Sequence, residues 1–116
     1  MKTREITLCG KTVNICYCLA TEIAFNKFTG VGVEEFDAKN PEHPVHLILS
    51  GIMSWCEANG AKPEVTDHDI IFNADATEFV KALKEMFELR QEWYAIPAGY
   101  NTENAAAEEQ AEEKNA

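Results

Sequence analysis

The sequence predicts an α+β fold in which an N-terminal β-hairpin packs on a small bundle of three to four helices, followed by a disordered acidic C-terminal tail. Three observations lead to this prediction. Apolar and polar residues alternate on both sides of Gly10-Lys11, apolar residues recur at helical spacing between positions 45 and 90, and no large apolar residue follows Tyr100. We expect one α+β domain over residues 1–97 and a separate tail over residues 98–116.

The hairpin is predicted from residues 4–9 and 12–17, which alternate as half-buried strands do. Gly10-Lys11 between them suits a two-residue type II′ turn, because glycine accepts the first position of that turn. This turn fixes a register in which Leu8 faces Val13 and Ile6 faces Ile15. One face of the hairpin then carries five apolar side chains, those of Ile6, Leu8, Val13, Ile15 and Tyr17. A lone hairpin is marginal in water, so we expect a helix to cover this face.

A short helix is predicted over residues 19–28, ending before Gly30, which suits a helix C-terminus. Its expected apolar stripe is Leu19, Ile23 and Phe28, and the apolar residues beside the stripe are Ala20, Ala24 and Phe25. Residues 31–39 are expected to form a loop, because they contain a glycine and several acids.

The next helix should begin at Asn40-Pro41-Glu42, which combines a capping residue, an early proline and an acid. Pro44 must then lie in the first turn, or the helix begins there. We expect this helix to end at Asn59-Gly60 and to be the most buried element. Its apolar stripe is Val45, Ile48, Leu49, Ile52, Met53 and Cys56.

Two capping patterns follow. Thr66, with Asp69 three residues later, predicts a short helical turn, although Ile70-Ile71-Phe72 also fits a strand. Asp75 repeats the pattern and predicts a long helix from Ala76 to about Tyr94. The expected stripe of this helix is Phe79, Val80, Leu83, Met86 and Phe87, with the stem of Arg90.

Composition limits the function classes. Twenty acidic residues against ten basic ones give a formal charge of −10, which argues against nucleic acid and against anionic membranes as partners. The sequence shows no signal peptide and no segment apolar enough to span a bilayer. We therefore expect a cytoplasmic protein with reduced cysteines. Self-association remains open.

Reactive residues do not form a recognisable site. A zinc site would use Cys9, Cys16, Cys18 and Cys56 with His43, His46 and His68, but their spacing differs from that of structural zinc sites. We expect these cysteines to be free thiols and His43 and His46 to be partly exposed. The carboxylate pairs Glu34-Glu35 and Asp67-Asp69 are expected to be solvated loop residues and helix caps. The sequence thus predicts no catalytic residues, no metal and no cofactor.

Trp93 and Tyr94 stand at the end of the predicted long helix, just before the tail. They are expected either to complete the core or to serve as anchors for a partner, since Trp and Tyr are enriched at interface hot spots.

The order of motifs resembles that of the tail assembly chaperones of long-tailed phages and prophages. The motifs are a hairpin with a central "GK", a helix ending in "FNKFTG", a long apolar helix, and "DATEFVKALKEMFELRQEW" before an acidic tail. The resemblance covers about residues 4–96. It implies a non-virion assembly factor that binds the tape measure protein, keeps it soluble and helps to recruit tail tube subunits. Some members also exist in a frameshift-extended form.

The resulting hypothesis is that exposed residues of the helical layer contact this client protein, and the candidates are Phe25, Phe28, Trp93 and Tyr94. Two alternatives belong to other classes. One is a structural tail or neck subunit that stays in the finished phage particle. The other is an acidic DNA-mimic inhibitor, whose binding would weaken strongly with added salt.

Overall fold

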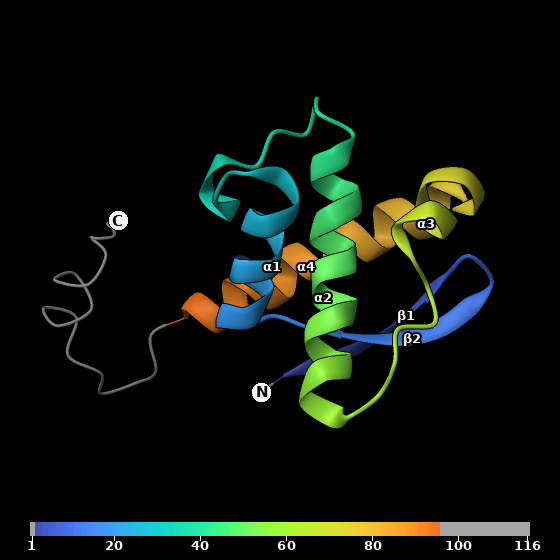
Figure 1. Cartoon of the computed structure of the whole chain (residues 1–116), viewed down its shortest axis with the longest axis horizontal. Helices are drawn as coiled ribbons and strands as arrows, with labels where there is room; N and C mark the ends of the chain where they lie inside the picture. The colour runs from blue at the N-terminus through green and yellow to red at the C-terminus, as the bar shows by residue number, and fades with distance from the viewer. Residues whose placement is uncertain (1, 96–116) are drawn as a thin grey trace, which may run out of the picture.

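The structure, a computed structural model, describes residues 2–95. It confirms the α+β class: an N-terminal two-stranded antiparallel hairpin packs on four α-helices. The elements are β1 (Thr3–Leu8), β2 (Lys11–Cys16), α1 (Leu19–Thr29), the 3-10 helix η1 (Val33–Glu35), α2 (Glu42–Asn59), α3 (Asp67–Asn73) and α4 (Ala76–Tyr94). Figure 1 shows α1 and α3 on opposite sides of α2, with α4 behind it. The predicted tail lies outside the described residues.

The hairpin forms with a different turn and register from those predicted. Cys9 and Gly10 are the central turn residues, and both have positive φ, 56° and 75°. This pattern defines a type I′ turn, whose twist matches that of the two strands. Ile6 therefore pairs with Val13, and Leu8 with Lys11. The shift is two residues along β1, so every side chain keeps its predicted face.

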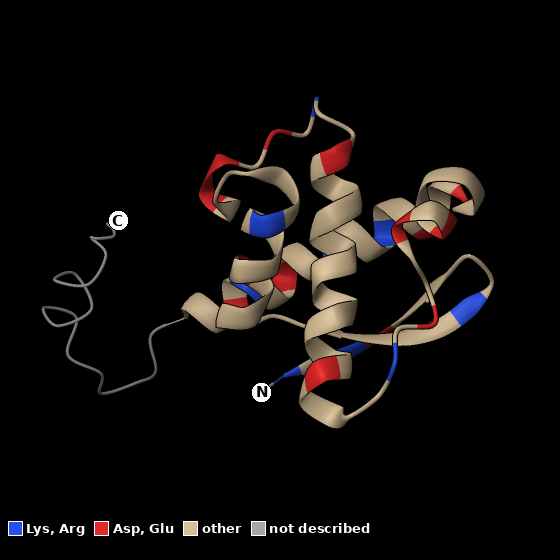
Figure 2. Cartoon of the chain, in the orientation of Figure 1, with Lys and Arg blue, Asp and Glu red and all other residues tan. Residues whose placement is uncertain are grey.

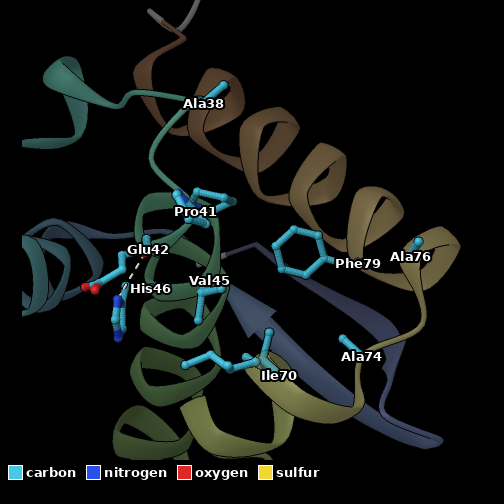
Figure 3. A pocket seen from close by; sticks show the side chains of 11 residues that line it. Ala38, Pro41, Glu42, Val45, His46, Ile70, Ala74, Ala76 and Phe79 are labelled. Carbon is cyan, nitrogen blue, oxygen red and sulfur yellow. Dashed lines mark hydrogen bonds between the residues drawn. The ribbon is translucent and has the colours of Figure 1, made fainter.

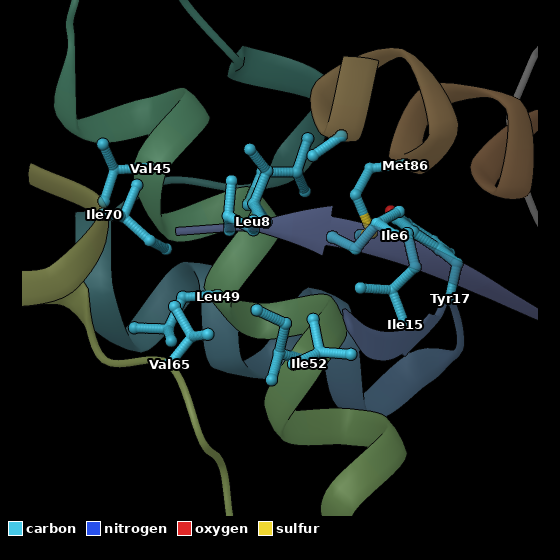
Figure 4. Close-up of a cluster of buried hydrophobic side chains, with 14 of the residues drawn as sticks. Ile6, Leu8, Ile15, Tyr17, Val45, Leu49, Ile52, Val65, Ile70 and Met86 are labelled. Atoms are coloured by element: carbon cyan, nitrogen blue, oxygen red, sulfur yellow. The ribbon is translucent and has the colours of Figure 1, made fainter. Parts of the chain in front are cut away.

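The apolar face of the hairpin is covered as predicted. Ile6, Leu8, Val13, Ile15 and Tyr17 are all buried. Helix α2 packs on β2, and α4 packs on β1. Figure 4 shows several of these side chains meeting Leu49 and Ile52 of α2 and Met86 of α4 in one core.

Helix α1 ends at Gly30 as predicted, with φ of 83° at that glycine, but the predicted stripe is wrong. Its buried residues are Thr21 and Phe25, whereas Leu19 and Ile23 are 59% and 52% exposed. The Thr21 hydroxyl donates to Ser54 Oγ of α2 at 2.9 Å, so this polar side chain is satisfied inside the core.

Helix α2 is the most buried helix, as the sequence predicts, and ends before Gly60, whose φ is 66°. Asn40 Oδ1 accepts a hydrogen bond from the Glu42 N–H at 3.0 Å, which satisfies a donor at the N-terminus of the helix. Pro44 lies in the first turn, where its missing N–H removes no intrahelical hydrogen bond.

Helices α3 and α4 begin at the predicted caps. Thr66 and Asp69 form a reciprocal capping box at α3, and the Asp75 carboxylate accepts from two backbone N–H groups at α4. The helical alternative for Ile70-Ile71-Phe72 is therefore the correct one. In α4, Val80 is 64% exposed, contrary to the predicted stripe, and the residues fully buried are Ala82, Met86 and Leu89. The predicted loop over residues 31–39 contains η1, whose Val33 is buried.

Candidate functional site

The predicted contact residues Trp93 and Tyr94 lie on the surface at the C-terminal end of α4, 41% and 52% exposed. Trp93 packs against Tyr17, with ring centroids 5.6 Å apart, and against Tyr94 at 4.9 Å. We call Tyr17, Trp93 and Tyr94 the aromatic corner. The Arg90 guanidinium lies 5.0 Å from the centre of the Tyr94 ring, a cation–π arrangement that restrains this ring.

Glu22 of α1 joins the aromatic corner to the first helix. The Tyr17 hydroxyl donates to Glu22 Oε2 at 2.8 Å, and the Tyr94 hydroxyl donates to the same oxygen at 2.5 Å. Burial, followed by this hydrogen bond and the Glu22 charge, raises the pKa of Tyr94 to about 12, so its hydroxyl stays a donor at neutral pH. The last turn of α4 is thereby fixed beside α1, whose Leu19 and Ile23 side chains are also exposed.

The other two predicted contact residues lie elsewhere. Phe25 is fully buried, with its ring 5.5 Å from that of His43 and 6.3 Å from that of Phe36, so it belongs to the core and not to an exposed surface. Phe28 is 37% exposed and stacks on His46 at 4.6 Å. The structure therefore brings Trp93 and Tyr94 together but does not add Phe25 or Phe28 to them.

A second surface, which the sequence analysis did not anticipate, is an open cavity of about 620 Å³ between the N-terminal halves of α2 and α4 and helix α3. We call it the apolar groove. Figure 3 shows Val45 of α2, Ile70 of α3 and Phe79 of α4 pointing toward one another within it. Its two polar lining residues are Glu42 and His46, and the others are Ala38, Pro41, Pro44, Val45, Ile70, Ile71, Ala74, Ala76 and Phe79.

The helices that form the walls of the groove also carry exposed apolar side chains. Ile71, which lines it, is 56% exposed, and Phe72 on the same helix is 71% exposed. Val80, next to the lining residue Phe79, is 64% exposed. Single apolar residues on a surface are ordinary, but a cavity bordered by several of them is typical of an interaction site.

Helix α3, which forms one wall of the groove, and the segment before it are held by contacts to the hairpin and to α2. Cys9 Sγ donates to the Asp69 carbonyl at 3.4 Å, and Lys11 Nζ donates to the Glu64 carbonyl at 2.9 Å. On the α2 side, His46 Nε2 lies 4.0 Å from an Asp67 carboxylate oxygen. The groove therefore has walls that are positioned before any partner arrives.

The prediction of partly exposed histidines is wrong for His43 and His46, which are 7% and 8% exposed. Each ring finds a local partner that makes burial favourable. His43 Nδ1 accepts the Asp37 N–H at 2.8 Å, and His46 Nδ1 lies 3.0 Å from the Glu42 carbonyl while its ring stacks on Phe28.

The cysteines, all within the described residues, are free thiols with no hydrogen bond to a histidine. Burial raises the pKa of the Cys9, Cys16 and Cys56 thiols, that of Cys16 to about 12. A reactive cysteine needs the opposite shift, because the thiolate is the nucleophile. Among residues 2–95, no three side chains of the His, Cys, Asp and Glu types gather as a metal-binding group.

Comparison with protein-family models, with curated proteins and with solved structures finds no match to this chain. Within the described part of the chain, no helix combines the length and the apolar character needed to cross a bilayer.

Proposed function

We propose that this protein is a non-catalytic tail assembly chaperone of a phage or prophage, which binds the tape measure protein and helps to bring tail tube subunits to it in the cytoplasm. The observation that carries the proposal is the apolar groove, with exposed Ile71, Phe72 and Val80 on the helices around it. A chaperone for a helical client needs such a surface, because it must cover the apolar stripes that the client exposes before assembly.

The arrangement of the elements supports the same function. A hairpin with a glycine-containing turn, a first helix ending in glycine and a mostly helical remainder are the features on which the resemblance to tail assembly chaperones rests. The strong negative charge of the chain favours the solubility of a complex with an apolar client.

The non-catalytic part of the proposal is supported by the state of three of the four thiols. Their raised pKa values keep Cys9, Cys16 and Cys56 protonated at neutral pH. Cys16 is also fully buried under the helices, so no substrate can reach its sulfur without local unfolding.

Co-expression with the tape measure protein of the phage or prophage that encodes this chain tests the proposal. We expect the tape measure protein to be insoluble alone and to co-purify with this chain in a soluble complex. A tape measure protein that stays insoluble, with no complex formed, would overturn the proposal. Mass spectrometry of finished particles separates a chaperone, which is absent from them, from a structural tail subunit, which is present.

A further inference from the structure

The lining of the apolar groove indicates which kind of ligand it can hold. Small-molecule sites carry a few convergent polar groups that orient the ligand. Here the polar lining residues are Glu42 and His46, and His46 is already engaged with the Glu42 carbonyl and the Phe28 ring. The helices beside the cavity also carry Phe72 and Val80, which do not line it and are 71% and 64% exposed.

The walls of the groove favour a helical ligand over an extended one. An added β-strand needs a free sheet edge that offers backbone hydrogen bonds. None of the residues that line the groove belongs to β1 or β2, so the groove offers no strand edge to such a ligand, and its walls are formed mostly by α2, α3 and α4. Side-chain contact from one face of a helix, with apolar residues three and four positions apart, fits such walls.

The charge around the groove sets a second requirement. Two acidic residues lie at its rim, because Glu42 lines it and an Asp67 carboxylate oxygen is 4.0 Å from Nε2 of the lining residue His46. Figure 2 shows acidic positions on α3 and at the N-terminal end of α2. No Lys or Arg is among the residues that line the groove, and the basic residue next to one of them in the sequence is Lys39, beside Ala38. Because acids outnumber bases here, positively charged flanks on the ligand are favoured.

We propose that the apolar groove binds one face of an amphipathic helix of the client, in which large apolar residues are flanked by lysine or arginine. This inference rests on the proposed function and specifies which segments of the client are bound. The apolar residues enter between Val45, Ile70 and Phe79, and the basic flanks meet the acidic rim.

Two isoleucines of similar exposure provide a matched pair of variants. Ile71, in the groove, is 56% exposed, and Ile23, on the far helix α1, is 52% exposed. Glutamate at either position leaves the core intact, which unchanged circular dichroism and thermal melting verify. The probes are overlapping 20-residue peptides that cover the tape measure protein used in the co-expression experiment, and their binding is measured by fluorescence anisotropy.

We expect the peptides that bind to carry apolar residues at helical spacing with basic flanks. Ile71→Glu should weaken their binding at least tenfold, and Ile23→Glu less than twofold. Replacing the basic flanks of a bound peptide by glutamate should weaken it at least fivefold. Equal binding by both variants, no effect of the flanks, or no bound peptide at all contradicts the inference.

The same variants separate this inference from the proposed function. If Ile71→Glu binds the peptides as wild type does while both still co-purify with the full-length tape measure protein, the groove is not the binding site although the chaperone function stands. If wild type itself fails to co-purify, the proposed function fails.

Discussion

Gly51 of α2 lies directly against Met86 of α4, so close that a Cβ added at Gly51 would stand 2.4 Å from the Met86 sulfur. This contact sets the spacing of the two helices that cover the hairpin. Met86 is fully buried, so its side chain has little room to move aside.

Gly51→Ala is therefore expected to lower the free energy of unfolding by about 1 kcal/mol, because an overpacking cost of about 1–3 kcal/mol exceeds the helix propensity gain of about 1 kcal/mol. Met86→Ala alone should cost about 2–5 kcal/mol. In the double variant the new methyl group fills part of the cavity, so the loss should be smaller than the sum by at least about 1 kcal/mol. Urea unfolding of wild type, the two single variants and the double variant measures this coupling. Additive losses of stability would show that the space for one side chain does not depend on the size of the other.

Arg4 of β1 joins the hairpin to α4 through three carboxylates. Its guanidinium donates to Glu85 at 2.5 Å, to Glu92 at 2.7 Å and also to Glu88. The hydrogen bond from Arg4 holds the pKa of Glu88 below its ordinary value of 4.5. The resulting stabilisation is complete above pH 4.5 and is lost as the pH falls through the lowered folded-state pKa.

We accordingly predict that Arg4→Met is less stable than wild type at pH 7 and that this difference shrinks below pH 4.5. Urea unfolding at pH 7 and at pH 3 measures it. Lys2→Met is the control, because Lys2 Nζ is 3.9 Å from Glu92 and its side chain is 74% exposed. If the difference in the free energy of unfolding between Arg4→Met and wild type stayed constant with pH, the pKa values of these carboxylates would not depend on Arg4.

The hairpin turn supplies a third prediction. Cys9 adopts a left-handed conformation, which costs a residue other than glycine roughly 1 kcal/mol and is best tolerated by asparagine. Cys9→Asn should therefore stabilise the protein by about 0.5 kcal/mol, whereas the β-branched Cys9→Val should destabilise it by at least about 1 kcal/mol. Thermal melting compares them. If valine were tolerated as well as asparagine, the turn would instead be centred on Gly10-Lys11.

Much of this architecture can be predicted from the sequence, because helix ends and strand faces depend on local chemistry. Gly30, Gly60, Thr66 and Asp75 mark helix boundaries through backbone conformation and capping that involve only neighbouring residues. The faces of the hairpin follow from alternation alone. Its register does not follow in this way. Glycine suits the second central position of a type I′ turn as well as the first of a type II′ turn, and the choice between them shifts the pairing of the strands by two residues.

The buried face of α1 could not be predicted from apolar spacing. Thr21 has a polar side chain, and it can be buried because Ser54, from a distant segment of the chain, accepts its hydrogen bond. Leu19 and Ile23 are left exposed as a consequence. Long-range partners of this kind are not visible in a local pattern.

One signal for the apolar groove was present in the sequence. Ile70, Ile71 and Phe72 are consecutive, and a short helix with one buried face cannot cover all three. In the structure Ile70 is buried and the other two face outward. Only the packing of α2, α3 and α4 shows that a cavity lies beside them.

The Trp93→Ala variant distinguishes a structural role of Trp93 from a role in binding the client. A fully buried tryptophan costs about 3–5 kcal/mol when truncated to alanine. Because Trp93 is 41% exposed, Trp93→Ala should cost about 1–2 kcal/mol and leave the fold intact. We predict that it also weakens co-purification of a tape measure fragment. Unchanged binding by a folded Trp93→Ala variant would remove the aromatic corner from the proposed contact surface and leave the groove.

The central claim is that the exposed apolar surface of this protein binds a helical client. Hydrogen exchange measured by mass spectrometry, with and without the tape measure protein, tests this claim most directly because it locates the contact on the chain. We predict slower exchange in α3, in the first turns of α2 and α4, and in the last turn of α4, with β1 and β2 unchanged. Protection confined to the hairpin, or no protection in any helix, would contradict the account.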